Sequence, residues 1–218
     1  MARWIVIIVL VLTGISIYVV QRRERAADSA AAASAPLQAL ASGCALPTAL
    51  AQGDGPVQSD ATGALSPLRL ADATLQPLAG FSVDARVLSA ERYSSDRESR
   101  YAPIDLALGW GRMREDAVLS ALEIGQSGRW YMYRWSQAEP PIPVQDIVRS
   151  SANMHMIPAT PAIANALEDI EQGDHIRIDG WLVQVQADDG WRWRSSLTRE
   201  DSGAGGCELV YVCAVYKR

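Results

Sequence analysis

The side chains best suited to covalent chemistry in this 218-residue chain are His155, Cys207 and the serine pair Ser195 and Ser196. A histidine titrates near neutral pH and can serve as a general base, whereas a thiol or hydroxyl beside it can serve as a nucleophile. His155 lies in the segment SANMHMIPA, well upstream of the serines and the cysteine. A hydrolase would therefore need the fold to bring His155 to one of the three, with a carboxylate orienting its ring.

Two acidic residues near these nucleophiles, Asp201 and Glu208, are the candidates for orienting the ring. No GxSxG elbow and no family-specific cysteine signature accompanies them. The serines can equally end a strand, the cysteine can begin one, and a histidine in a loop often bonds only to the backbone. We therefore assign no catalytic residue from the sequence and keep His155, Cys207, Ser195 and Asp201 as candidates.

Aromatic and basic residues alternate in GWRWRSSLTRED, the segment that contains the two serines. Tryptophan faces can stack on bases or sugars, and arginines can bind phosphate. Against nucleic acid stand the formal net charge of −5 and the acidic residues that flank the segment, and tryptophans can also simply fill a core. We expect no nucleic-acid partner, and the candidate binding residues for another ligand are Trp191, Trp193, Arg192, Arg194, Arg199, Asn153 and His155.

Metal ions and cofactors leave no recognisable pattern in the sequence. The glycine-rich stretch DSGAGG, residues 201–206, precedes a predicted strand and lacks the lysine of a phosphate-binding loop, so it is typical of a hairpin connection. No CxxC pair and no Cys/His zinc spacing is present. We therefore predict neither a metal site nor a cofactor.

The chain has three cysteines, an odd number. Cys207 and Cys213 fall on one face of one predicted strand, about 20 Å apart at about 3.3 Å per residue, and cannot pair with each other. Cys44 could reach either one if the intervening chain folds back. We expect buried or unpaired thiols.

Three segments together, SANMHMIPA, GWRWRSSLTRED and GAGGCELVYV, resemble a family of membrane-anchored bacterial proteins that has no established activity. The resemblance covers about residues 80–215. It implies an anchored chain with a common folded domain. It implies no reaction, and it carries over no functional residue.

The N-terminal residues 1–25 predict a single transmembrane anchor with a basic flank. Residues 4–20 carry no charge and are long enough to span a bilayer, and QRRER follows where a signal peptide would need a cleavage site. The arginines after the span favour a cytoplasmic domain by one charge, whereas a short tail before a long domain favours export. We expect a single-pass protein of the bacterial inner membrane with its domain in the periplasm, and a cytoplasmic domain is the alternative.

The remaining chain divides into a linker and one domain. Residues 26–77 are rich in Ala, Ser, Pro and Gly and predict a flexible tether. Residues 78–218 predict an α+β domain, a small antiparallel β-barrel that is OB-like, with one or two short helices. A strand begins near Phe81, a helix begins at Thr160-Pro161 and ends near residue 172, and Gly180 can host a bulge.

Taken together, these patterns favour a membrane-tethered binding or structural module of the bacterial cell envelope, acting on a protein or envelope partner and not as an enzyme. One alternative is a tethered hydrolase that uses His155 with Cys207 or with Ser195 or Ser196. A second is single-stranded nucleic-acid binding through an OB-like face.

Overall fold

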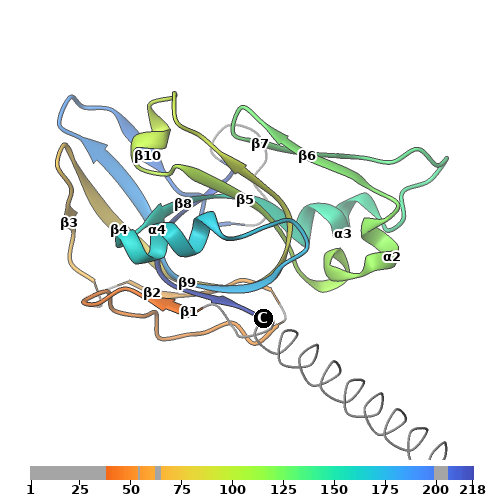
Figure 1. Ribbon diagram of the computed structural model, residues 1–218, viewed down its shortest axis with the longest axis horizontal. Coiled ribbons are helices and arrows are strands. Elements are labelled where there is room, and N and C mark those ends of the chain that lie inside the picture. Colours follow the sequence, from red (N-terminus) through yellow and green to blue (C-terminus); the bar gives the residue numbers. More distant parts are fainter. Residues whose placement is uncertain (1–37, 54, 62–64, 199–205) are drawn as a thin grey trace, which may run out of the picture. The chain divides into compact units, whose positions relative to one another are not determined.

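The chain divides into two units, and every strand and helix described below lies in the unit Leu37–Lys217. Within the part of the chain that the structure describes, no helix is long and apolar enough to cross a membrane. The predicted anchor at residues 4–20 lies outside the described residues. The computed structural model (Figure 1) describes residues 38–53, 55–61, 65–198 and 206–218.

Most of this unit is β-structure, and its described residues include three short α-helices and two 3₁₀ helices. The strands are β1 (Gln38–Leu40), β2 (Val57–Asp60), β3 (Leu68–Arg69), β4 (Ala73–Arg92), β5 (Ile104–Gly109), β6 (Glu123–Ser127), β7 (Trp130–Arg134), β8 (Ser151–Pro158), β9 (His175–Ala187), β10 (Arg192–Arg194) and β11 (Glu208–Lys217). The helices are η1 (Glu98–Arg100), η2 (Gly111–Arg114), α2 (Asp116–Leu119), α3 (Val144–Arg149) and α4 (Pro161–Glu168).

One mixed sheet contains nine of these strands, with the order β1-β11-β8-β5-β4-β9-β10, and β2 and β3 pair with β4 beside this path. β11 pairs with β9 as well as with β8, so the sheet bends back on itself. The prediction of a β-rich domain with few helices is confirmed. The prediction of an antiparallel β-barrel is wrong in one pair of strands, because β8 and β11 run parallel and the sheet is therefore mixed.

The apolar residues of β4 and α4 form the larger core. Phe81, Val83 and Val87 alternate along β4 as the sequence predicts and are buried in the same cluster as Ile163 of α4. The helix begins where Thr160-Pro161 indicates, and the Thr160 hydroxyl accepts a hydrogen bond from the Ile163 amide at 3.3 Å. It ends at Glu168, before the predicted residue 172.

Gly180 lies at a close crossing of two strands. A Cβ atom at this position would lie 2.1 Å from the Tyr211 carbonyl oxygen of β11, so only glycine fits there. The sequence predicted a bulge at Gly180. The register shifts occur on the partner strands instead, between Val212 and Ala214 of β11 and between Pro77 and Ala79 of β4.

The compact unit begins well before residue 78, inside the segment predicted to be a flexible tether. β1 pairs with β11, and β2 and β3 pair with β4. Residues 38–53, which we call the strap, also dock through hydrogen bonds: the Ala51 amide donates to Ser82 Oγ at 2.8 Å. The Ala/Pro-rich composition concealed these strands because their few apolar residues do not alternate over a long stretch.

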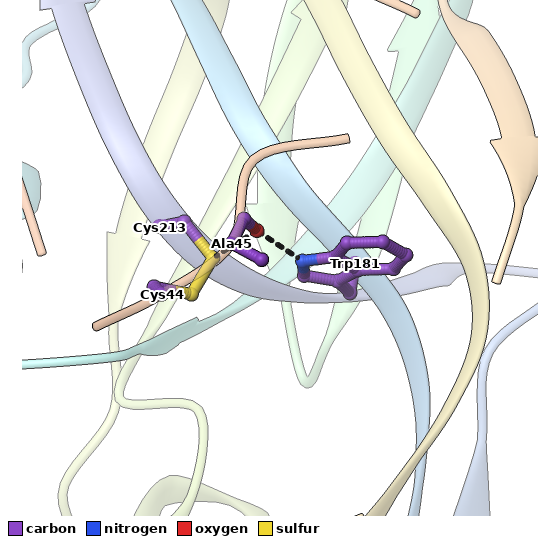
Figure 2. The surroundings of a disulfide bond; sticks show 4 residues. All are labelled: Cys44, Ala45, Trp181 and Cys213. Atoms are coloured by element: carbon purple, nitrogen blue, oxygen red, sulfur yellow. Dashed lines mark hydrogen bonds between the residues drawn. A yellow bond between two sulfur atoms is a disulfide. The ribbon is translucent and has the colours of Figure 1, made fainter. Parts of the chain in front are cut away.

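A disulfide joins the strap to the last strand, contrary to the expectation of unpaired thiols. Cys44 of the strap is bonded to Cys213 of β11, with the two Cα atoms 5.6 Å apart (Figure 2). Beside the bond, the indole nitrogen of the fully buried Trp181 donates a hydrogen bond to the Ala45 carbonyl at 2.7 Å. Of the three cysteines, Cys207 is free.

The two strands β6 and β7 form a separate antiparallel hairpin. The aromatic strand predicted around residues 129–136 is therefore present as β7, outside the main sheet. Its Tyr131 and Tyr133 side chains are partly buried, whereas Trp130 and Met132 are 47% and 52% exposed. The hairpin contacts the main sheet at β4 and β8.

Candidate functional site

Three neighbouring segments of the sheet bring an acid, a base and a thiol together. Asp105 of β5 is in register with His155 of β8, and His155 is in register with Leu209 of β11. Cys207 lies two residues before Leu209, so it shares the face of the sheet that carries His155. His155 Nδ1 lies 2.9 Å from Asp105 Oδ1.

The electrostatics of this group favour a protonated imidazole. Asp105 is fully buried and His155 is 5% exposed. Burial alone would lower the pKa of His155, but the interactions with Asp105 and then with Cys207 raise it to about 9. The ring N–H of His155 is not aligned for a hydrogen bond to Asp105, so this contact is best described as charge–charge attraction at 2.9 Å.

Asp105 is held by two further side chains. Arg129 Nη1 donates to Oδ1 of Asp105 at 2.8 Å, and Asn153 Nδ2 donates to Oδ2 at 3.1 Å. Asn153, one of the predicted binding residues, is itself fixed by Gln126 of β6, whose Nε2 donates to Asn153 Oδ1 at 2.5 Å. The carboxylate therefore has a fixed orientation toward His155.

Aromatic rings pack against the histidine. The Trp193 ring of β10 lies 4.8 Å from the His155 ring, and Trp191 lies 5.9 Å from Trp193. Trp191 in turn stacks on Tyr101 at 5.9 Å, and the Arg97 guanidinium lies 4.6 Å from its ring centre. The structure thus brings the predicted residues Trp191 and Trp193 to His155, with faces that already contact protein groups.

The predicted arginines are not part of this cluster. Arg192 and Arg194 alternate with Trp193 along β10 and are exposed, and Arg194 donates to Gln184 Oε1 at 3.0 Å. Arg199 and Asp201 lie outside the described residues, so their predicted roles stay predictions. Among the described residues, no group of three or more His, Cys, Asp or Glu side chains is arranged to hold a metal ion.

The two serines have structural partners near Cys207. Ser195 Oγ donates to the Ser196 carbonyl at 2.7 Å and accepts from the Leu209 amide at 3.0 Å. The Ser196 amide donates to the Cys207 carbonyl at 3.0 Å. These bonds fix the start of β11, so the serines position Cys207 and Cys207 is the better candidate nucleophile.

The structure brings the candidates His155 and Cys207 together, but one of the two carboxylates named from the sequence, Glu208, does not join them. Glu208 is in register with Met154, so its side chain lies on the face opposite His155. Asp105 was missed, although one signal was present: it is the only charged residue in the buried strand IDLALG. Arg129 was also missed, because nothing in the sequence shows that the turn carrying it lies against β5.

No family model matches the chain, and neither a curated protein nor a solved structure shows significant similarity to it. The site is therefore interpreted from its own geometry and chemistry.

Proposed function

We propose that this chain is a membrane-tethered enzyme of the bacterial cell envelope that uses Cys207 as a nucleophile. In this proposal His155 is the acid–base residue, and Asp105 orients its ring and stabilises its protonated form. The observation that carries it is the convergence of Asp105, His155 and Cys207 on one face of the sheet, with Nδ1 of His155 at 2.9 Å from Asp105. This is the acid–base–nucleophile arrangement that acyl-transfer enzymes share across unrelated folds.

The reaction class that fits is hydrolysis of an ester, thioester or amide. The thiol proton of Cys207 would reside on His155 as the imidazolium, and the thiolate would attack the acyl carbon and form a thioester. The imidazolium would return that proton to the leaving group as the acyl–heteroatom bond breaks. Water would then hydrolyse the thioester and regenerate the thiol. The partial exposure of Cys207, against the burial of His155 and Asp105, leaves the sulfur as the reachable atom.

The envelope location is supported by the cysteine pairing. Disulfides form and persist in oxidising compartments and are rare in the bacterial cytoplasm. The bond between Cys44 and Cys213 therefore favours an exported domain, anchored through residues 4–20 in the inner membrane. Reporter fusions after Arg218 test this topology, and a cytoplasmic reporter would remove the envelope assignment.

The decisive test is the rate at which iodoacetamide alkylates Cys207 as a function of pH. A neighbouring imidazolium favours the thiolate form, so Cys207 should react at pH 6 at least tenfold faster in the wild type than in His155→Gln. Cys207→Ser should show no alkylation, because the other two cysteines are bonded. His175→Gln, which replaces the other histidine of the chain, is the matched control and should stay within about twofold of the wild type. Equal rates in the wild type and His155→Gln would refute the proposed pair.

A second candidate function, the binding module expected from the sequence, is favoured by the exposed hairpin. Trp130 and Met132 protrude from β7. A hollow of about 310 Å³ on the same hairpin is lined by Ile124, Tyr133 and their neighbours. Replacing Trp130 and Met132 together with serine should abolish binding of an envelope partner and leave Cys207 alkylation unchanged if the two functions are separate.

For the fold, we propose an OB-like connectivity without full closure. Its support is that β4, β5, β8, β11 and β9 each pair with two others of this set, with α4 between β8 and β9. The likeness does not support nucleic-acid binding, because Trp191 already stacks on Tyr101 and Trp193 packs against the His155 ring.

A further inference from the structure

The turn between β6 and β7 delivers one arginine into the site. Gly128 and Arg129 form this turn, with φ of 57° and 72°. Left-handed backbone is easily adopted by glycine but is strained for arginine. A strained residue of this kind persists only where strong contacts hold it, and Arg129 has such contacts.

Arg129 uses its guanidinium fork on two acids. Nε and Nη2 donate to the two carboxylate oxygens of Asp96 at 2.7 and 2.8 Å. Nη1 donates to Asp105 Oδ1 and to the Ala102 carbonyl, both at 2.8 Å. The group also lies 3.9 Å from the ring centre of Tyr93, and it lowers the pKa of Asp96 to about 2.

A single oxygen of Asp105 thus serves two cations. Its Oδ1 lies 2.8 Å from Nη1 of Arg129 and 2.9 Å from Nδ1 of His155. The other ionisable groups that face this cluster are Asp96 from the loop before η1, Tyr93 from the end of β4 and Cys207 from the start of β11. The negative charge of Asp96 partly neutralises Arg129. Arg129 in turn weakens the attraction between Asp105 and His155, because it interacts with the same carboxylate oxygen.

We propose that Arg129 is a positioning residue that divides the charge of Asp105 between the β6–β7 hairpin and His155. This inference rests on the proposed function, since it takes Cys207 and His155 as the reacting pair. A base that is bound too firmly to its carboxylate keeps its proton and cannot return it to the leaving group. By sharing Oδ1, Arg129 limits how firmly His155 holds that proton, and Asp96 limits the effect of Arg129.

Two substitutions should therefore move the His155 titration in opposite directions. Arg129→Met removes a cation near the imidazolium and should raise its apparent pKa by roughly one unit. Asp96→Asn removes an anion and leaves Arg129 to act on Asp105 alone, so the apparent pKa should fall below that of the wild type. A role confined to folding would lower thermal stability in both variants without opposite shifts.

The measurement is the titration of the histidine ring protons by NMR on the full chain in detergent micelles, with its disulfide formed. The chain has only two histidines, so His175→Gln assigns the signal of His155. Arg129→Lys keeps the charge without the fork and should titrate close to the wild type. If Arg129→Met does not fold, Asp96→Asn and Arg129→Lys still test the direction.

Unchanged titration in Arg129→Met, or a shift of the same sign in Asp96→Asn, would overturn the division of charge. Cys207 alkylation separates this result from the proposed function. If alkylation depends on His155 while the titrations do not move, the inference alone fails. If the titrations move as expected while alkylation ignores His155, the charge division stands and the cysteine enzyme does not.

Discussion

Cys207 and Cys213 lie on the same strand segment and on the same face, yet their surroundings differ completely. Cys213 is fully buried, sits among Trp181, Leu209 and other apolar side chains, and is bonded to Cys44 of the strap. Cys207 is partly exposed, free, and lies beside His155. One end of β11 therefore serves the stability of the fold, and the other end presents a thiol to an acid–base pair.

The difference shows that the environment decides the chemistry of a cysteine. An apolar pocket favours neither a thiolate nor attack by solvent, whereas a neighbouring imidazolium stabilises the thiolate form. The strap reaches Cys213 because β1 pairs with the C-terminal half of β11, between Ala214 and Tyr216. It does not extend to Cys207 at the other end.

Removing the disulfide should have the largest effect on stability. The bond closes a loop across a sequence separation of 169 residues, and loops of this size stabilise a fold by about 3–5 kcal/mol. We expect Cys44→Ala combined with Cys213→Ala to lower the free energy of unfolding in urea by that amount. Cys207→Ala is the control and should change it by less than about 1 kcal/mol. A double variant as stable as the wild type would show that the disulfide at Cys213 does not stabilise the fold.

The pH dependence of the free energy of unfolding should show how much the protonated form of His155 stabilises the fold. Because the folded pKa is about 9 against an ordinary 6.5, the stabilisation is complete below pH 6.5 and is lost as the pH rises toward 9. The loss should be on the order of 3 kcal/mol. Urea unfolding at pH 6, 7.5 and 9 should show this fall in the wild type and a flatter profile in His155→Gln. Parallel profiles would mean that Asp105 and Cys207 do not stabilise the imidazolium.

A smaller effect should follow from the hydrogen bond that fixes the strap. Trp181→Phe removes the donor to the Ala45 carbonyl and leaves a buried acceptor without its partner, so we expect a loss of about 2 kcal/mol. Trp130→Phe, on the exposed hairpin, should cost less than about 0.5 kcal/mol. Similar losses in both variants would show that the strap does not depend on this bond.

The sequence predicted the local features of this fold better than its long-range ones. Alternation around Phe81 and the cap at Thr160 depend on neighbouring residues, and both are confirmed. β1 and β2 were missed because each is short and depends on a partner strand elsewhere in the chain. The bulge expected at Gly180 was misplaced, because a glycine is required there by the close approach of the Tyr211 backbone and not by a bulge.

The candidate site shows the same limit. His155 and Cys207 could be named from residue type, but their convergence depends on the pairing of β8 with β11, which joins distant segments. Asp105 and Arg129 depend on two further long-range contacts, the register of β5 with β8 and the docking of the β6–β7 turn. Nearby acids in the sequence, such as Glu208, were favoured because proximity along the chain is all that a single sequence offers.

The disulfide also determines how the unit would respond to mechanical tension. A pull between the two ends of the chain would first separate β1 from the end of β11, and among the described residues only 38–43 and 214–218 could peel away before the bond between Cys44 and Cys213 became taut. From there the force would pass directly to Cys213 and bypass residues 45–212, among them Asp105 and His155. A chain tugged by its N-terminal side could therefore be stretched without distorting the site.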